Sequence, residues 1–262
     1  MSVASDIEHG LASAHGCRIA YESAGTGAPP LLLIHGGFGD RSYLAPQQAH
    51  FAGLRRVLSL DLRGHGESDF PETVSMEDFA GDVIAVADDA GIDGAVLCGH
   101  SMGGAVSLLV AAARPDLVRA IVMLDGVVLF PEPVRRQGLE SLVPALSTDH
   151  WLDALRGFFG RTIEENDPPQ VRDRVMADLA RTRPAFARSF FTSLFASDFA
   201  DELRQVDRPL LYIHAHAPAD LQRLAELRPD AMVGKVVGSG HYVMLSAPEQ
   251  VNAMIDRFLE TL

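Results

Sequence analysis

The chain has 262 residues, a length that a single α/β domain can reach. It carries 22 basic and 35 acidic side chains and a formal net charge of −13 at pH 7. Such a charge repels phosphate backbones and anionic lipid head groups, which argues against nucleic acid and membrane surfaces as partners.

The sequence shows no signal for export, membrane insertion or metal binding. The start, MSVASDIEHG, lacks the apolar core of a signal peptide, and no apolar run is long enough to span a bilayer. The two cysteines, Cys17 and Cys98, lie far apart and match no metal or disulfide framework. We therefore expect a cytoplasmic protein without a bound metal ion.

A predicted β-hairpin at residues 11–24 is followed by a series of short apolar runs. Continuous apolar runs of this length are typical of strands buried on both faces of a parallel sheet. Amphipathic helical stretches separate them, and this alternation predicts an α/β fold with a mostly parallel sheet flanked by helices. The predicted strands are 31–35, 55–61, 95–100, 119–125, 209–215 and 232–237.

Two of the predicted helices carry start signals. Ser75 with Asp78 resembles a capping box for a helix near 75–90. Ser246 with Glu249 has the full S-x-x-E pattern and predicts the start of the last helix.

The alternation stops between Asp125 and Arg208, where helical stretches are interrupted by prolines. We predict a helical lid at 128–205, inserted after the sixth strand of a core domain formed by 1–127 and 206–262. Eight of the 13 phenylalanines and the single tryptophan fall in this region. Some of these rings should form the lid's own core and others should roof an apolar pocket. Trp151 and Phe186 are the candidates for contact with substrate.

The segment from Gly99 to Gly104, GHSMGG, lies between a predicted strand and a predicted helix. A sharp strand-to-helix turn holds its central residue in a strained conformation and leaves room only for small residues two positions away. Gly99 and Gly103 occupy those positions around Ser101. The pattern predicts a nucleophilic Ser101 raised above the sheet edge, at the positive end of a helix.

A serine hydroxyl needs a base within hydrogen-bond reach. His241 lies in a glycine-containing loop between the last predicted strand and the last helix, where the base belongs in the chain order serine, acid, histidine. His35 and His65 follow earlier strands, and we interpret them as structural hydrogen-bonding residues. The side chain of His100 should point away from the nucleophile.

The oxyanion formed on attack needs preorganised N–H donors. We expect one from the backbone of Met102 and the other from Gly37, in the flexible glycine-rich loop that follows the strand at 31–35. Phe38, the next residue, either lines the pocket or packs beneath the lid.

Four segments together resemble the α/β-hydrolase superfamily over essentially the whole chain. They are the HGG after the third strand, the DLRGHGESD turn at 61–69, the GHSMGG segment and the terminal GSGHYVMLSAPEQV. The chain looks most similar to the esterase and lactonase branch with a lid after the sixth strand. The resemblance implies an α/β-hydrolase fold in which the DLRGHGESD turn is scaffold.

The resemblance leaves two candidates for the acid. Most members have an aspartate after the seventh strand, but here Ala217 and Pro218 stand at those positions and Asp220 comes late. Asp125, at the end of the sixth strand, is the other location that the superfamily uses. Zearalenone-type lactonases, which the chain resembles in size and triad spacing, are among the members that use it. We favour Asp125 over Asp220 as the acid that orients His241.

A triad with an oxyanion hole implies acyl transfer, and no cofactor fingerprint is present. The phenylalanines favour a largely apolar small-molecule ester or lactone as substrate, and we interpret the lid arginines Arg135, Arg136, Arg156 and Arg161 as surface residues. Two alternatives stay open: a carbon–carbon bond hydrolase, whose G-N-S-M-G-G segment is similar, and a small-molecule receptor with residual turnover. The sequence leaves the oligomeric state open and is compatible with a homodimer.

Overall fold

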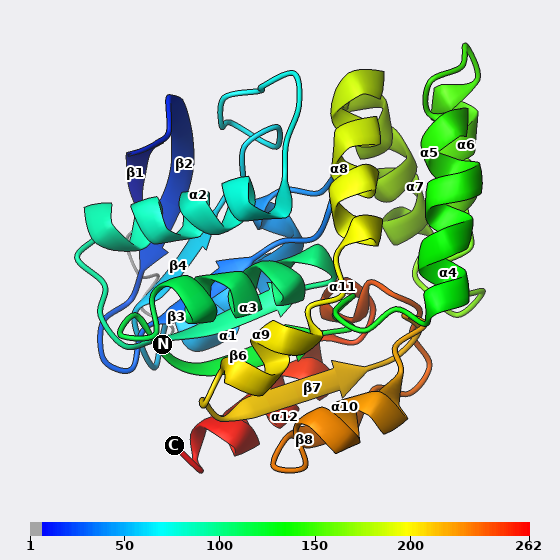
Figure 1. Cartoon of the computed structure of the whole chain (residues 1–262). Helices are drawn as coiled ribbons and strands as arrows, with labels where there is room; N and C mark the ends of the chain where they lie inside the picture. Colours follow the sequence, from blue (N-terminus) through cyan, green and yellow to red (C-terminus); the bar gives the residue numbers. More distant parts are fainter. Residues whose placement is uncertain (1–6) are drawn as a thin grey trace.

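Eight strands form one sheet in the order β1-β2-β4-β3-β5-β6-β7-β8 in the computed structural model, which describes residues 7–262 (Figure 1). Every strand expected from the sequence is present. The strands are β1 (Glu8–Ala14), β2 (Cys17–Ala24), β3 (Leu31–Ile34), β4 (Val57–Leu60), β5 (Ala95–His100), β6 (Val118–Leu124), β7 (Leu210–His214) and β8 (Met232–Lys235).

The sheet is mostly parallel, as predicted. β1 pairs antiparallel with β2, and β2 pairs antiparallel with β4. The remaining neighbours, from β4 through β3 to β8, are all parallel. Every residue of β3, β4 and β5 is buried, which explains why these strands read as unbroken apolar runs rather than as alternating patterns.

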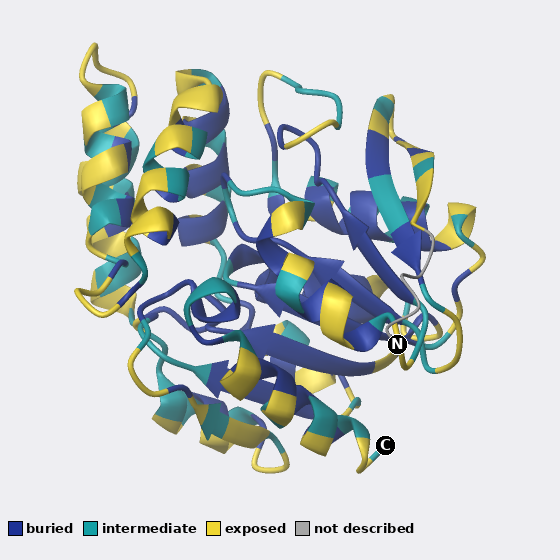
Figure 2. Ribbon diagram, turned by 180° about the vertical axis from the view of Figure 1, so that it is seen from behind, coloured by how far each residue is buried: buried dark blue, intermediate teal, exposed yellow. Residues whose placement is uncertain are grey.

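Helices cover both faces of the sheet (Figure 1). On one face lie α2 (Met76–Asp89), α3 (Met102–Ala113) and α9 (Ala200–Gln205), and on the other lie α1 (Ala45–Phe51) and α12 (Pro248–Leu259). The strands at the centre are dark blue in Figure 2, whereas the surrounding helices are striped, buried toward the sheet and exposed outward. The shorter elements of the core are η1 (Arg41–Leu44), α10 (Leu221–Leu227) and α11 (Val243–Ser246).

The chain between β6 and β7 is helical, and the structure describes all of it without a strand. Its elements before α9 are α4 (Glu132–Gln137), η2 (Gly138–Leu142), α5 (Val143–Ala145), α6 (Trp151–Gly160), α7 (Pro169–Asp178), η3 (Leu179–Arg181) and α8 (Pro184–Ala196). Figure 1 shows α4 to α8 grouped beside the sheet, beyond the arrowhead of β7. We call residues 128–199, from the loop before α4 to the start of α9, the inserted helical segment.

One of the two predicted helix starts is confirmed and the other is wrong. Ser75 and Asp78 form a reciprocal capping box at the start of α2. At the last helix, Ser246 instead ends the short helix α11, and Ala247 is the N-cap residue of α12 without a side-chain hydrogen bond. Pro248 fixes the first position of α12 because it needs no N–H partner there, and this places Ser246 one residue too early to act as the cap.

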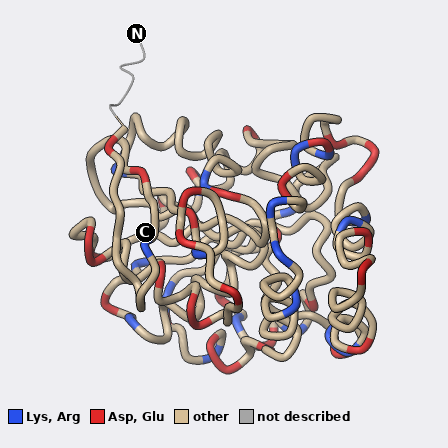
Figure 3. Tube along the Cα trace, turned by 90° about the horizontal axis from the view of Figure 1, so that it is seen from above, with Lys and Arg blue, Asp and Glu red and all other residues tan. Residues whose placement is uncertain are grey.

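Acidic and basic residues are interspersed along the trace (Figure 3). Within residues 7–262, no helix has the length and apolar character needed to cross a membrane.

Candidate active site

Ser101 lies at a strained turn between β5 and α3. Its backbone has φ 52° and ψ −116°, a conformation that costs free energy for a residue with a side chain. A Cβ atom on Gly99 would lie 2.1 Å from the carbonyl oxygen of Gly103, and one on Gly103 would lie 2.4 Å from that of Ile34. The two glycines are therefore required by close backbone contacts, as the sequence pattern predicts.

Asp125 follows the end of β6 and contacts His241 directly. Its Oδ2 lies 2.7 Å from Nδ1 of His241, and the aspartate side chain is completely buried. The backbone N–H groups of Ala215 and Ala217 donate to the two carboxylate oxygens at 2.7 Å each, and that of His216 donates at 3.0 Å. The loop in which most relatives carry the acid therefore supplies hydrogen-bond donors to Asp125 instead.

These contacts keep Asp125 ionised despite its burial. Burial disfavours the charged carboxylate, but the hydrogen bond from His241, the charge of that ring and the backbone donors outweigh it. The pKa of Asp125 is accordingly below its ordinary value. An ionised Asp125 that accepts from Nδ1–H leaves Nε2 of His241 as the basic nitrogen.

Asp220, the other candidate acid, has a different role. It is the N-cap residue of α10, and its Oδ1 accepts a hydrogen bond of 2.9 Å from the N–H of Arg223. Of the two candidates, only Asp125 contacts His241.

Ser101 and His241 line the same pocket, although no hydrogen bond joins their side chains within residues 7–262. Catalytic contacts are often loose before substrate binds. The backbone of His241 is fixed from two sides. Its N–H donates to the carbonyl of Thr162 at 2.9 Å, and its carbonyl accepts from Nε2 of His100 at 3.0 Å.

His100 fixes the backbone of His241, a contact that was not predicted from the sequence. Burial and the neighbouring His241 lower the pKa of His100 to about 3, so the ring is neutral and donates through Nε2. Its ring centroid lies 4.7 Å from that of His241. Its place next to Ser101 was a signal that could have revealed this contact, whereas nothing in the sequence marked Thr162.

The loop after β3 brings a free backbone donor toward Ser101. The N–H of Phe38 donates to Nε2 of His65 at 2.9 Å, which fixes the loop. Within the described residues, neither Gly37 nor Met102 donates its backbone N–H to another protein group. Gly37 lines the pocket with Ser101, and Met102 is the first residue of α3. Both are available to an oxyanion.

His35 and His65 are structural hydrogen-bonding residues, as interpreted from the sequence. Nε2 of His35 accepts from the N–H of Leu62 at 3.0 Å, and Nδ1 of His65 lies 2.9 Å from the carbonyl of Arg63.

The pocket has a volume of about 190 Å³ and is largely aromatic. Rings from the inserted helical segment make up much of its wall: Phe130, Phe158, Phe159, Phe190, Phe191 and Phe195. Trp151 and Phe186, the candidates for contact with substrate, do not line it, and neither does Phe38, for which the sequence left two positions open. Phe38 is buried against Phe190, Phe186 lies one helical turn before Phe190 and packs on His65, and Trp151 is partly buried at the start of α6.

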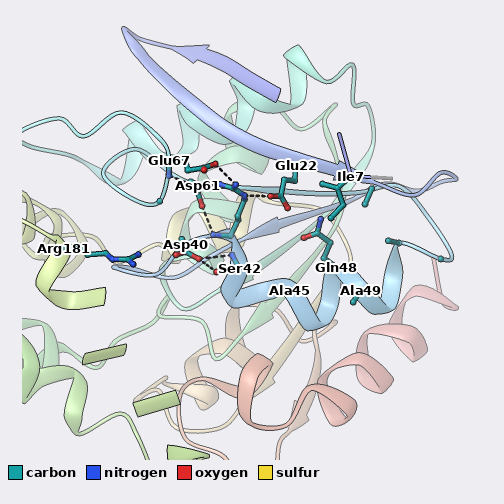
Figure 4. Close-up of a pocket in the computed structure, with 15 residues that line it drawn as sticks. Ile7, Glu22, Asp40, Ser42, Ala45, Gln48, Ala49, Asp61, Glu67 and Arg181 are labelled. Carbon is teal, nitrogen blue, oxygen red and sulfur yellow. Dashed lines mark hydrogen bonds and ion pairs between the residues drawn. The ribbon is translucent and has the colours of Figure 1, made fainter. Parts of the chain in front are cut away.

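A larger cavity, of about 690 Å³, lies elsewhere on the molecule and contains neither Ser101 nor His241 (Figure 4). Arg41 in its wall is ion-paired with Glu22 at 2.9 Å, with Glu67 at 2.6 Å and with Asp61. Asp61 also accepts the backbone N–H groups of Arg41 and Glu67. These contacts anchor the DLRGHGESD turn and agree with the scaffold role that the resemblance implies.

Within residues 7–262, no three or more histidine, cysteine, aspartate or glutamate side chains are grouped so that they could hold a metal ion.

The fold and the strained serine at the strand-to-helix turn are those of an α/β hydrolase. The sequence matches the alpha/beta hydrolase family over residues 31–254, and the chain belongs to that family.

Two curated relatives and one solved structure illustrate the similarity. The chain is 30% identical over 249 residues to the dihydrolipoyllysine-residue acetyltransferase component of the acetoin cleaving system of Pseudomonas putida. That match covers 91% of this chain and 65% of the relative, so the chain spans less than two thirds of that protein. It is 27% identical over 261 residues to 2-(acetamidomethylene)succinate hydrolase of Mesorhizobium japonicum, covering 93% and 92% of the two chains.

The enol-lactonase of Burkholderia xenovorans LB400 superposes with a TM-score of 0.85 at 24% identity, covering 96% of this chain and 100% of that chain. This likeness supports the fold.

Proposed function

We propose that the protein is a serine hydrolase that cleaves a carboxylic ester or lactone of a largely apolar small molecule. Ser101 is the nucleophile, His241 the general base and Asp125 the acid that orients it. The observation that carries the proposal is the 2.7 Å contact between the buried Asp125 and His241, which lines the same pocket as the strained Ser101.

The reaction proceeds in two halves. In the first, Nε2 of His241 takes the proton of Ser101 while Oγ attacks the substrate carbonyl, and the N–H groups of Gly37 and Met102 hold the oxyanion. The carbonyl re-forms as the bond to the alkoxide breaks, and His241 protonates the leaving alcohol. In the second half, His241 takes a proton from water as the oxygen attacks acyl-Ser101. The tetrahedral intermediate then collapses, the acid is released, and His241 returns its proton to Oγ of Ser101.

The aromatic wall favours an apolar acyl group or ring next to the reacting carbonyl. Much of this wall comes from the inserted helical segment, which supports a lid at 128–205 over a core of 1–127 and 206–262. The cytoplasmic location and the homodimer stay predictions from the sequence.

The test is the hydrolysis of p-nitrophenyl acetate and p-nitrophenyl octanoate by the wild type and by Ser101→Ala. We expect turnover of at least one ester, and a loss of about 10⁴-fold or more in kcat in the variant, because the nucleophile and base act as one unit. Equal rates for the two proteins would contradict the proposal. Ligand binding with no turnover of either ester would favour a small-molecule receptor, and cleavage of a vinylogous diketone alone would favour the carbon–carbon bond hydrolase.

A further inference from the structure

Besides Ser101 and His241, three polar residues line the catalytic pocket: Arg161, Thr162 and His216. Phenylalanine is the most frequent residue in the rest of the lining. The sequence predicts a surface position for Arg161, and the residue is exposed. It also lines the pocket that contains Ser101.

Arg161 lines the pocket and, within the part of the chain that the structure describes, forms no ion pair with a carboxylate. It lies at the C-terminal end of α6, with Cζ 6.0 Å from the ring centroid of Phe158, which also lines the pocket. Within residues 7–262, no aspartate or glutamate lies within ion-pair distance of Arg161, although acidic residues outnumber basic ones 35 to 22 in the chain. The nearby Glu164 is occupied, since its Oε1 lies 3.0 Å from Nδ1 of His216.

His216 adds a second polar group to the pocket lining. The backbone N–H of His216 donates to Asp125, and Nδ1 of its ring is hydrogen-bonded to Glu164. Nε2 of the ring is therefore available to a ligand. Asp125 is fully buried and bonded to His241 and the backbone, and within the described residues it forms no ion pair with Arg161. An unpaired guanidinium beside an aromatic wall is suited to a carboxylate, which it binds through two parallel hydrogen bonds.

We propose that the substrate carries a carboxylate that Arg161 binds, with His216 beside it, while the apolar part lies among the phenylalanine rings next to Ser101. This inference rests on the proposed function, since it assigns the substrate class of the same site. The protein then hydrolyses esters or lactones that carry a carboxylate in preference to neutral esters of equal length.

The test compares p-nitrophenyl hydrogen adipate with p-nitrophenyl hexanoate, which have acyl chains of equal length and differ in the terminal carboxylate. We expect the wild type to prefer the adipate by about tenfold or more in kcat/KM after subtraction of spontaneous hydrolysis. Arg161→Gln should abolish that preference, mainly by raising KM for the adipate.

Arg156→Gln is the matched control, because Arg156 lies on the same helix, is exposed and does not line the pocket. It should keep the wild-type preference. No preference in the wild type, or an equal loss in both variants, would overturn the inference while leaving the serine hydrolase intact.

Binding gives a readout that does not depend on turnover. Monomethyl adipate is titrated by calorimetry into proteins that carry Ser101→Ala, so that the ester is not hydrolysed. It should bind Ser101→Ala with and without Arg156→Gln equally, and bind Ser101→Ala with Arg161→Gln about tenfold more weakly. If neither p-nitrophenyl ester is hydrolysed, the proposed function fails, and this titration still decides whether Arg161 binds a carboxylate. Equal affinity for all three proteins would refute it.

Discussion

Ser101 and Asp125 share an unusual backbone conformation, with φ values of 52° and 47°. They follow the neighbouring strands β5 and β6, and hydrogen bonds hold both turns. The N–H of Ser101 donates to Leu124 at 2.9 Å, and that of Asp125 to Ile213 at 2.7 Å. Strain of this kind persists only where surrounding contacts enforce it, and it concentrates at functional sites. Positive φ also occurs at His15, Phe38 and Phe199, so the backbone geometry agrees with the motif analysis at Ser101 and Asp125 without singling them out.

The role of Asp125 can be separated from that of Asp220 by exchanging each for asparagine. Asp125→Asn should lower kcat by about 10³- to 10⁴-fold, because an amide no longer selects the productive tautomer of His241. Asp220→Asn should leave kcat within about threefold, since asparagine also caps helices well. Ester hydrolysis measured beside thermal unfolding checks both. Full activity in Asp125→Asn would refute its assignment as the acid.

The contact between Asp125 and His241 could be predicted from residue order, because the end of a parallel strand and the loop after the last strand meet at one edge of the sheet. The residues that form the pocket wall could not be predicted from residue order. Phe186 and Phe190 lie on the same side of α8, yet only Phe190 reaches the pocket. The depth at which α8 lies against the pocket depends on tertiary packing, which leaves no periodic signal in the sequence.

At the scale of elements, the turn between β5 and α3 depends on a close approach of two backbones. A Cβ on Gly103 would meet the carbonyl oxygen of Ile34 at 2.4 Å and that of His35 at 3.0 Å. Both neighbours are main-chain atoms at the end of β3, so a larger residue would displace the strand or the helix.

Gly103→Ala should therefore reduce the free energy of unfolding by about 2–4 kcal/mol, through overpacking against fixed backbone. Gly157→Ala is the control, because Gly157 lies within α6 and a Cβ atom added there would have no neighbour within 4 Å. It should raise the free energy of unfolding by about 0.5–1 kcal/mol, through the lower entropy of the unfolded chain. Urea denaturation measures both. A Gly103→Ala protein as stable as the wild type would contradict the close approach.

The two predicted helix starts show why one local pattern succeeds and another fails. Ser75 is followed directly by α2, and its box forms. Ser246 matches a stronger pattern, but it is the last residue of the short helix α11. Pro248 instead determines where α12 begins. The fixed φ of proline determines the start of the helix more strongly than the hydrogen bond of a side-chain cap does.

For the whole molecule, the fold was largely predictable and the order of its strands was not. Unbroken apolar runs separated by helices specify a parallel sheet. The adjacency of β3 to both β4 and β5 depends on contacts between distant segments, which a single sequence does not display. The same long-range packing brings Thr162 of the inserted helical segment onto the backbone of His241. That segment thus contacts the loop that carries His241 and also forms part of the pocket wall.

The most direct test of the account is labelling by a fluorophosphonate, which reacts covalently with an activated serine, followed by mass spectrometry of the intact protein and its peptides. We predict one adduct per chain, located on Ser101, with no labelling in Ser101→Ala and labelling slowed by about 10³-fold or more in Asp125→Asn. An unlabelled protein, or an adduct on another serine while esters are still hydrolysed, would contradict the assignment of Ser101 as the nucleophile.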